Sequence, residues 1–126
     1  MLFRSRENAV IRLEEGYEER YKKMMEENFI LAAMAQHTFV KYSEEFAEIA
    51  AATMSKELKL RNSGVRQAGF YVLVGASMPN ALIEIGYISN KKEEQYLRSE
   101  SGQRKIAAAL FKSILQYKEA YERSLE

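Results

Sequence analysis

The fold of this chain is decided by residues 70–90, which read FYVLVGASMPNALIEIGYISN. Residues 70–74 and 81–88 are rich in β-branched and aromatic side chains, a composition typical of strands. Both runs are nearly all apolar, which predicts strands that are covered on both faces. Residues 75–80 between them are too few for a helical crossover. The two strands are therefore expected to run antiparallel or to meet at a sharp corner.

Upstream of this stretch the sequence predicts helices. Residues 7–39 are dense in good helix formers, with Gly16 expected to bend or split the helix. A second helix is expected to begin at Ser43, a favourable N-cap, and to end near residue 60. Asn62, Ser63 and Gly64 then indicate a turn.

Downstream of this stretch two more helices are expected. Asn90 should cap a short helix, with Glu93 completing a capping box. A last helix should start at Ser101, and its buried face is expected to consist of Ile106, Leu110, Ile114 (or Ser113), Tyr117 and Tyr121.

Composition excludes several classes of protein. The 19 basic and 18 acidic side chains give a net charge of +1, so no global field attracts nucleic acid. No stretch reaches the roughly 20 apolar residues of a transmembrane helix. Residues 1–8 are not followed by an apolar core, so no signal peptide is expected. Cysteine is absent and His37 is the single histidine, so a zinc site made by this chain alone would depend on carboxylates.

Taken together, these patterns predict one domain, residues 1–126, of the α+β class: mainly helices packed on a short sheet of about two strands. Two strands form a marginal sheet unless helices cover them or another chain extends the edge. We therefore expect an exposed sheet edge and apolar face that favour self-association.

Glu84 is the residue in this stretch that requires an explanation. An ionised carboxylate inside an apolar strand is costly unless it is paired, hydrogen-bonded or near a metal. At a strand end that faces a cleft, such a group can transfer protons. Two alternatives stay open: the strand has one covered face and Glu84 points to solvent, or Glu84 pairs with Arg61 or Arg66.

The motif around Glu84 resembles a known family. Residues 79–90, PNALIEIGYISN, are similar to the C-terminal signature of the zinc-dependent N-acetylmuramoyl-L-alanine amidases of type 3. The resemblance extends through residues 43–58 and 103–117, and the chain resembles the C-terminal half of the α/β amidase fold. It implies hydrolysis of the bond between N-acetylmuramic acid and L-alanine in peptidoglycan, at the cell envelope, with Glu84 as the catalytic carboxylate.

The same resemblance implies what this chain lacks. The family's zinc ligands, two histidines and a glutamate, lie upstream of a Glu-Asn pair that Glu7 and Asn8 resemble. His37 has neither histidine context and is expected to be a helix-surface or packing residue. Zinc therefore belongs to the parent family, and we expect no bound metal and no hydrolysis by this chain alone.

Further expectations concern the surroundings of Glu84 and the region of residues 14–28. Arg66 and Gln67 are candidate contacts to substrate carboxylates, with an ordinary surface turn as the alternative. Residues 14–28 lie where some family members insert a regulatory helix, and simple packing is the favoured interpretation. Two further readings of the whole chain remain: a non-catalytic module that binds peptidoglycan or a partner, and a helical structural protein related only by ancestry.

Overall fold

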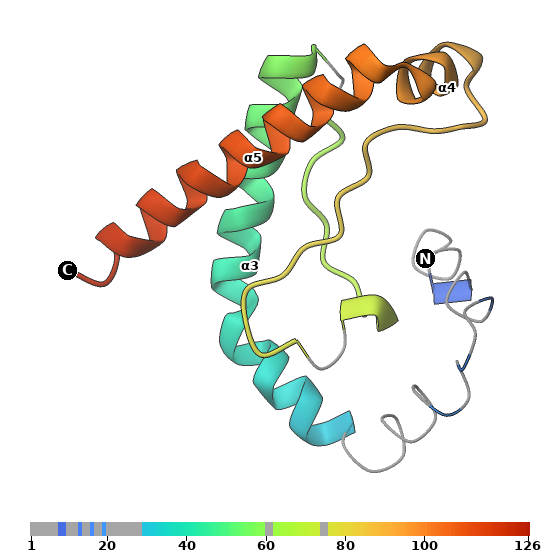
Figure 1. Ribbon diagram of the computed structural model, residues 1–126. Coiled ribbons are helices and arrows are strands. Elements are labelled where there is room, and N and C mark those ends of the chain that lie inside the picture. The colour runs from blue at the N-terminus through green and yellow to red at the C-terminus, as the bar shows by residue number, and fades with distance from the viewer. Residues whose placement is uncertain are drawn as a thin grey trace. The chain divides into compact units, whose positions relative to one another are not determined.

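The computed structural model describes residues 8, 9, 13, 16, 19, 29–59, 62–73 and 76–126, and for residues 29–38 and 71 the backbone only. The described elements are helix α3 (Phe29–Leu58), the short 3-10 helix η3 (Tyr71–Leu73), helix α4 (Lys91–Arg98) and helix α5 (Glu100–Arg123) (Figure 1). The chain divides into two compact units. The first unit is Met1–Ser43 with Arg66–Leu82, and the second unit is Glu44–Val65 with Ile83–Glu126.

Helix α3 is continuous through Ser43, where a second helix was expected to begin. Residues 29–58 contain neither glycine nor proline, so no residue in this stretch breaks the helix. The Ser43 hydroxyl does not cap a helix but accepts a hydrogen bond from the backbone N–H of Asn80 at 3.0 Å. The predicted boundary is therefore wrong.

Most of the predicted N-terminal helix, including the suggested regulatory region 14–28, lies outside the described residues. Gly16 is described, and its φ of 78° is a conformation that glycine adopts far more readily than other residues. This backbone geometry fits the predicted interruption at Gly16.

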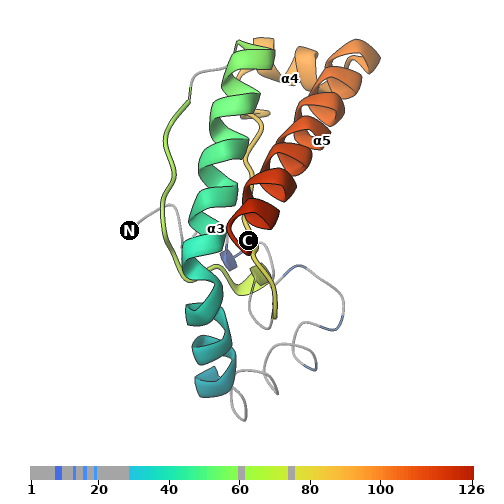
Figure 2. The same ribbon diagram turned by 90° about the vertical axis from the view of Figure 1, so that its left-hand side faces the viewer.

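The core of the second unit lies between the later half of α3 and α5, which crosses it (Figures 1 and 2). Met54 from α3 is buried against Ile106 and Ala109 from α5. Around them pack partly buried side chains from both helices, from α4 and from residues 83–85: Leu58, Ile83, Ile85, Tyr96, Leu97 and Leu110. Burial of this kind stabilises by about 25 cal/mol for each Å² of apolar surface removed from water.

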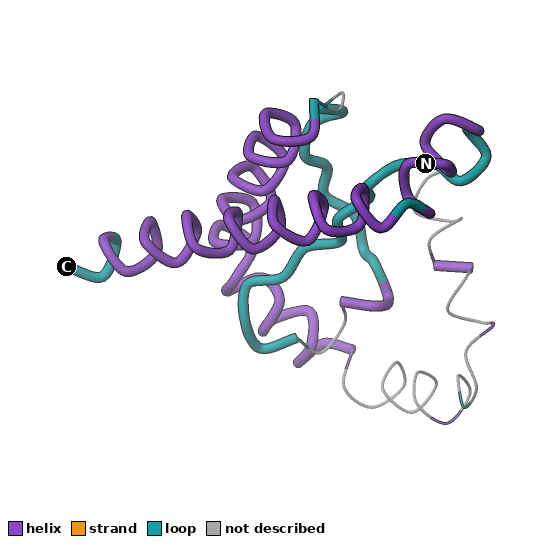
Figure 3. The backbone as a smooth tube through the Cα atoms, turned by 45° about the horizontal axis from the view of Figure 1, so that its top comes forward, coloured by secondary structure: helices purple, strands orange, loops and turns teal. Residues whose placement is uncertain are grey.

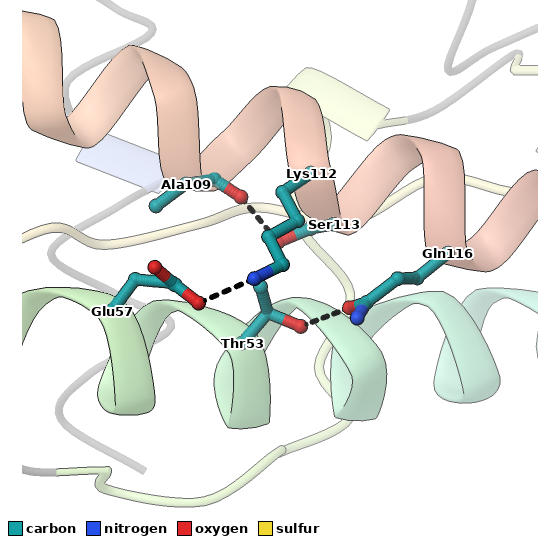
Figure 4. Close-up of polar contacts among 6 residues, drawn as sticks. All are labelled: Thr53, Glu57, Ala109, Lys112, Ser113 and Gln116. Carbon is teal, nitrogen blue, oxygen red and sulfur yellow. Dashed lines mark hydrogen bonds and ion pairs between the residues drawn. The ribbon is translucent and has the colours of Figure 1, made fainter.

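Polar contacts fix the register of α5 on α3 (Figure 4). Thr53 Oγ1 donates to Gln116 Oε1 at 2.5 Å, and Lys112 Nζ donates to Glu57 Oε1 at 2.6 Å. The hydrogen bond from Lys112, reinforced by its charge, lowers the pKa of the Glu57 carboxyl below its ordinary value.

The sequence left open whether Ile114 or Ser113 belongs to the buried face of α5. Because Ser113 is 1% exposed and Ile114 is 51% exposed, Ser113 is the buried residue.

A tight corner joins α4 to α5. Ser99 ends α4 and caps α5, its hydroxyl accepting from the Gly102 N–H at 3.0 Å and donating to the Tyr96 carbonyl at 2.8 Å. A Cβ on Gly102 would collide with that same carbonyl oxygen. Helix α5 therefore begins at Glu100, one residue before the predicted start, and needs glycine at its third position.

The predicted sheet is not present in the described part of the chain, which is drawn as helix and loop without a strand (Figure 3). Where the first strand was expected, Tyr71–Leu73 form η3, closed by the Leu73 N–H donating to the Phe70 carbonyl at 3.1 Å. Residues 81–86 are irregular, and a turn follows, in which the Asn90 N–H donates to the Tyr87 carbonyl at 3.0 Å. The α+β prediction is therefore wrong for the described residues, because a strand exists only where a neighbouring strand completes its hydrogen bonds.

Candidate functional site

Glu84 lies on an irregular segment that is anchored from one side. Its neighbours Ile83 and Ile85 are partly buried against the core of the second unit, whereas Glu84 and Gly86 are exposed. This alternation is that of a segment with one covered face. The predicted two-sided burial is therefore wrong, and the expected desolvation of Glu84 loses its basis. Glu84 is therefore an exposed residue on an anchored backbone.

A structured turn follows Glu84 directly. Glu93 Oε2 accepts a hydrogen bond from the Tyr87 N–H at 2.7 Å, which ties the turn to the first turn of α4. Gly86 has a φ of 139°, and a Cβ there would lie 3.0 Å from the same carboxylate oxygen. Glycine therefore permits both the backbone geometry and the close approach of Glu93. The next residue, Tyr87, is 58% exposed.

The cap of α4 beyond this turn agrees with the predicted capping box at Asn90 and differs from it at Glu93. Asn90 Oδ1 accepts from the backbone N–H groups of Lys92, at 3.0 Å, and Glu93, at 3.4 Å, as predicted. Glu93 was expected to reach back to the N–H of Asn90 but binds that of Tyr87. The contact by which Glu93 holds the turn beside Glu84 was not predicted. The position of Glu93, three residues after the cap, was the feature of the sequence that pointed to it.

The candidate substrate contacts belong to a different unit. Arg66 and Gln67 are exposed residues of the first unit, whereas Glu84 belongs to the second. In the first unit, the Asn8 side-chain amide donates to the Gly69 carbonyl at 2.9 Å, close in sequence to these two residues. Their assignment to substrate stays a prediction.

The donor groups of the described residues do not form a zinc site. No group of three or more histidine, cysteine, aspartate or glutamate side chains converges among the described residues. His37 lies within α3, and its side chain is outside the described part. With one histidine and no cysteine, the chain offers few of the ligands that zinc prefers.

Comparison with known proteins supplies the context for Glu84. The family model described as N-acetylmuramoyl-L-alanine amidase matches residues 8–116, which include the motif and all described helices except the end of α5. This chain belongs to the N-acetylmuramoyl-L-alanine amidase family. The family predicted from residues 79–90 is thereby confirmed.

Individual members of this amidase family are also similar to the chain. The N-acetylmuramoyl-L-alanine amidase AmiC of Escherichia coli is 32% identical over 84 residues, which are 67% of this chain and 20% of AmiC. The probable cell wall amidase LytH of Staphylococcus saprophyticus is 32% identical over 71 residues, 56% of this chain and 24% of LytH. The chain thus spans about a quarter or less of these two relatives. No solved structure matches it.

Proposed function

We propose that this chain is the carboxylate-bearing part of a peptidoglycan amidase, with Glu84 as its proton-transfer residue. The observation that carries the proposal is the family match over residues 8–116, which includes Glu84 within Pro-x-x-Leu-Ile-Glu. The bond to be hydrolysed joins the lactyl group of N-acetylmuramic acid to L-alanine. The products are a glycan strand and a free stem peptide.

The anchoring of Glu84 supports this role. A general base accepts a proton from the attacking water, and as a general acid it then protonates the leaving amine. The residue must be accessible to substrate and fixed in position. Proton transfer by such a positioned group raises the reaction rate by about 10²–10⁴-fold. Ile83 and Ile85 fix the backbone on either side, and the Glu93 contact fixes the turn that follows.

Because one histidine and no cysteine are few ligands for zinc, we propose that the chain alone does not hydrolyse peptidoglycan. Arg66 and Gln67 are proposed to contact substrate carboxylates. The name of one relative as a probable cell wall amidase supports a place of action at the cell envelope.

No described helix combines the length and the apolar character needed to cross a bilayer. The proposed self-association through a sheet edge loses its basis, because the described residues contain no strand.

Exchange of segments tests the proposal. In Escherichia coli AmiC, the 84-residue region that matches this chain would be replaced by the corresponding residues of this chain. We expect the chimera to release stem peptide from muropeptides, measured by mass spectrometry, and the chain alone to release none with or without added zinc. An inactive but folded chimera would contradict the amidase role. Sedimentation of the chain with purified sacculi, without cleavage by the chimera, would favour the non-catalytic binding module.

A further inference from the structure

Helix α5 carries a second apolar face, opposite the one that packs on α3. Phe111, Ile114 and Leu115 are 63%, 51% and 43% exposed, and Ala107 and Ala108 are also exposed. At 100° per residue these side chains form one stripe along α5. We call it the outer face of α5 and define it as Ala107, Ala108, Phe111, Ile114 and Leu115.

Charged pairs bound the outer face at both ends. Glu100 and Arg104 form an ion pair at 2.6 Å before it, and Lys118 and Glu122 form one at 2.8 Å after it. All four residues lie within about 20° of the line through Phe111 on the helix surface, by the same spacing of about 100° per residue. The outer face is therefore a closed apolar patch between two polar borders, a pattern that marks interaction surfaces.

We propose that the outer face of α5 binds the outer face of a second copy of this chain, with the two helices antiparallel. A twofold axis near Ser113 places Arg104 opposite Glu122 of the partner subunit, because each lies nine residues from it. The same axis places Phe111 against Leu115 of the partner subunit, two residues from the axis on either side. Every contact then occurs twice, as in an isologous interface.

Charge selects this arrangement over its alternative. Parallel pairing would bring Arg104 against Arg104 of the partner subunit and Glu122 against its own equivalent, both repulsive. Antiparallel pairing turns both contacts into attractions and also opposes the two helix dipoles. Small side chains at Ala107 and Ala108 allow the helices to approach closely. The inference uses only the second unit and does not depend on the amidase role.

Sedimentation velocity over a hundredfold concentration range tests the dimer. We expect the wild-type chain to change from monomer to dimer as concentration rises, and Phe111→Glu to remain monomeric at every concentration. Ile88→Glu is the matched control, because Ile88 is 80% exposed but lies outside α5. It should dimerise as the wild type does. Circular dichroism would verify that each variant keeps its helical content.

A charge exchange tests the antiparallel register. Arg104→Glu should weaken dimerisation about tenfold, since two cross-subunit contacts become repulsive. Adding Glu122→Arg to the same chain should restore it. A wild-type chain that stays monomeric, a Phe111→Glu variant that dimerises normally, or a double variant that recovers nothing would each overturn the proposal.

Discussion

The corner between α4 and α5 and the segment around Glu84 are neighbours in sequence, yet they depend on the rest of the molecule in opposite ways. The corner is closed by residues within a few positions of one another, through Ser99 and Gly102. The segment around Glu84 is held by distant side chains that cover Ile83 and Ile85. Local hydrogen bonds let a helix form wherever its sequence permits, whereas an extended segment takes its structure from whatever packs beside it.

The largest loss of stability should come from a change in the core that supports both regions. Ile106→Ala removes a side chain that is 5% exposed and should lower the free energy of unfolding by about 3 kcal/mol. Ile114→Ala deletes the same atoms from the exposed face of the same helix and, at concentrations where the chain is monomeric, should cost well under half of that. Urea denaturation of both variants measures the difference. Equal losses would mean that α5 does not pack on α3 through Ile106.

The corner itself is tested by Gly102→Ala. In an exposed helix this change stabilises by about 1 kcal/mol. Here the new Cβ meets the Tyr96 carbonyl, so we expect a loss of about 2 kcal/mol, typical of overpacking. Ser101→Ala, one residue earlier and exposed, is the control and should be nearly neutral. A stabilised Gly102→Ala variant in thermal denaturation would show that the corner is looser than described.

Asn90→Ala tests the turn after Glu84, because it removes the cap of α4. Two backbone N–H groups lose their acceptor, and we expect a cost of about 1 kcal/mol in chemical denaturation. Asn90→Asp keeps an acceptor and a favourable charge at the helix start, so it should retain most of the stability. If alanine and aspartate behave alike, the side chain of Asn90 does not cap α4.

The smallest effect should be a pH dependence at Glu57. Its pKa is lowered in the folded chain by the Lys112 hydrogen bond, so the stabilisation is present above the unfolded pKa and is lost as pH falls through the folded pKa. Glu57→Gln should therefore lower the Tm slightly at neutral pH and not at strongly acidic pH. With Lys112→Met already in place, Glu57→Gln should change nothing at either pH. A difference that persists in acid would exclude the ion pair as its source.

The same contrast explains what the sequence could predict. The cap at Asn90 and the helices after it depend on neighbouring residues, and their positions were predicted to within one residue. The strands at 70–74 and 81–88 were not, because β propensity describes a segment that needs a partner strand, and no described segment provides one. Ser43 shows the same limit, since its acceptor role depends on Asn80, distant in sequence.

For the candidate site, the identity of the residue was easier to predict than its surroundings. Glu84 was singled out by its motif, and the family match includes it. The expected burial of its carboxylate was wrong because apolar neighbours at alternate positions cover only their own face. The contact of Glu93 with Tyr87 was missed because Gly86 redirects the backbone, with a φ of 139° that composition does not reveal.

The assignment of Glu84 as the proton-transfer residue has a direct kinetic test. In the chimeric amidase described above, the rate of stem-peptide release would be compared between Glu84→Gln and Glu48→Gln, which neutralises an exposed carboxylate on α3. We predict a loss of at least about 10²-fold for Glu84→Gln, the contribution of a positioned acid–base group, and an unchanged rate for Glu48→Gln. An equal rate in the two variants would contradict the assignment of Glu84.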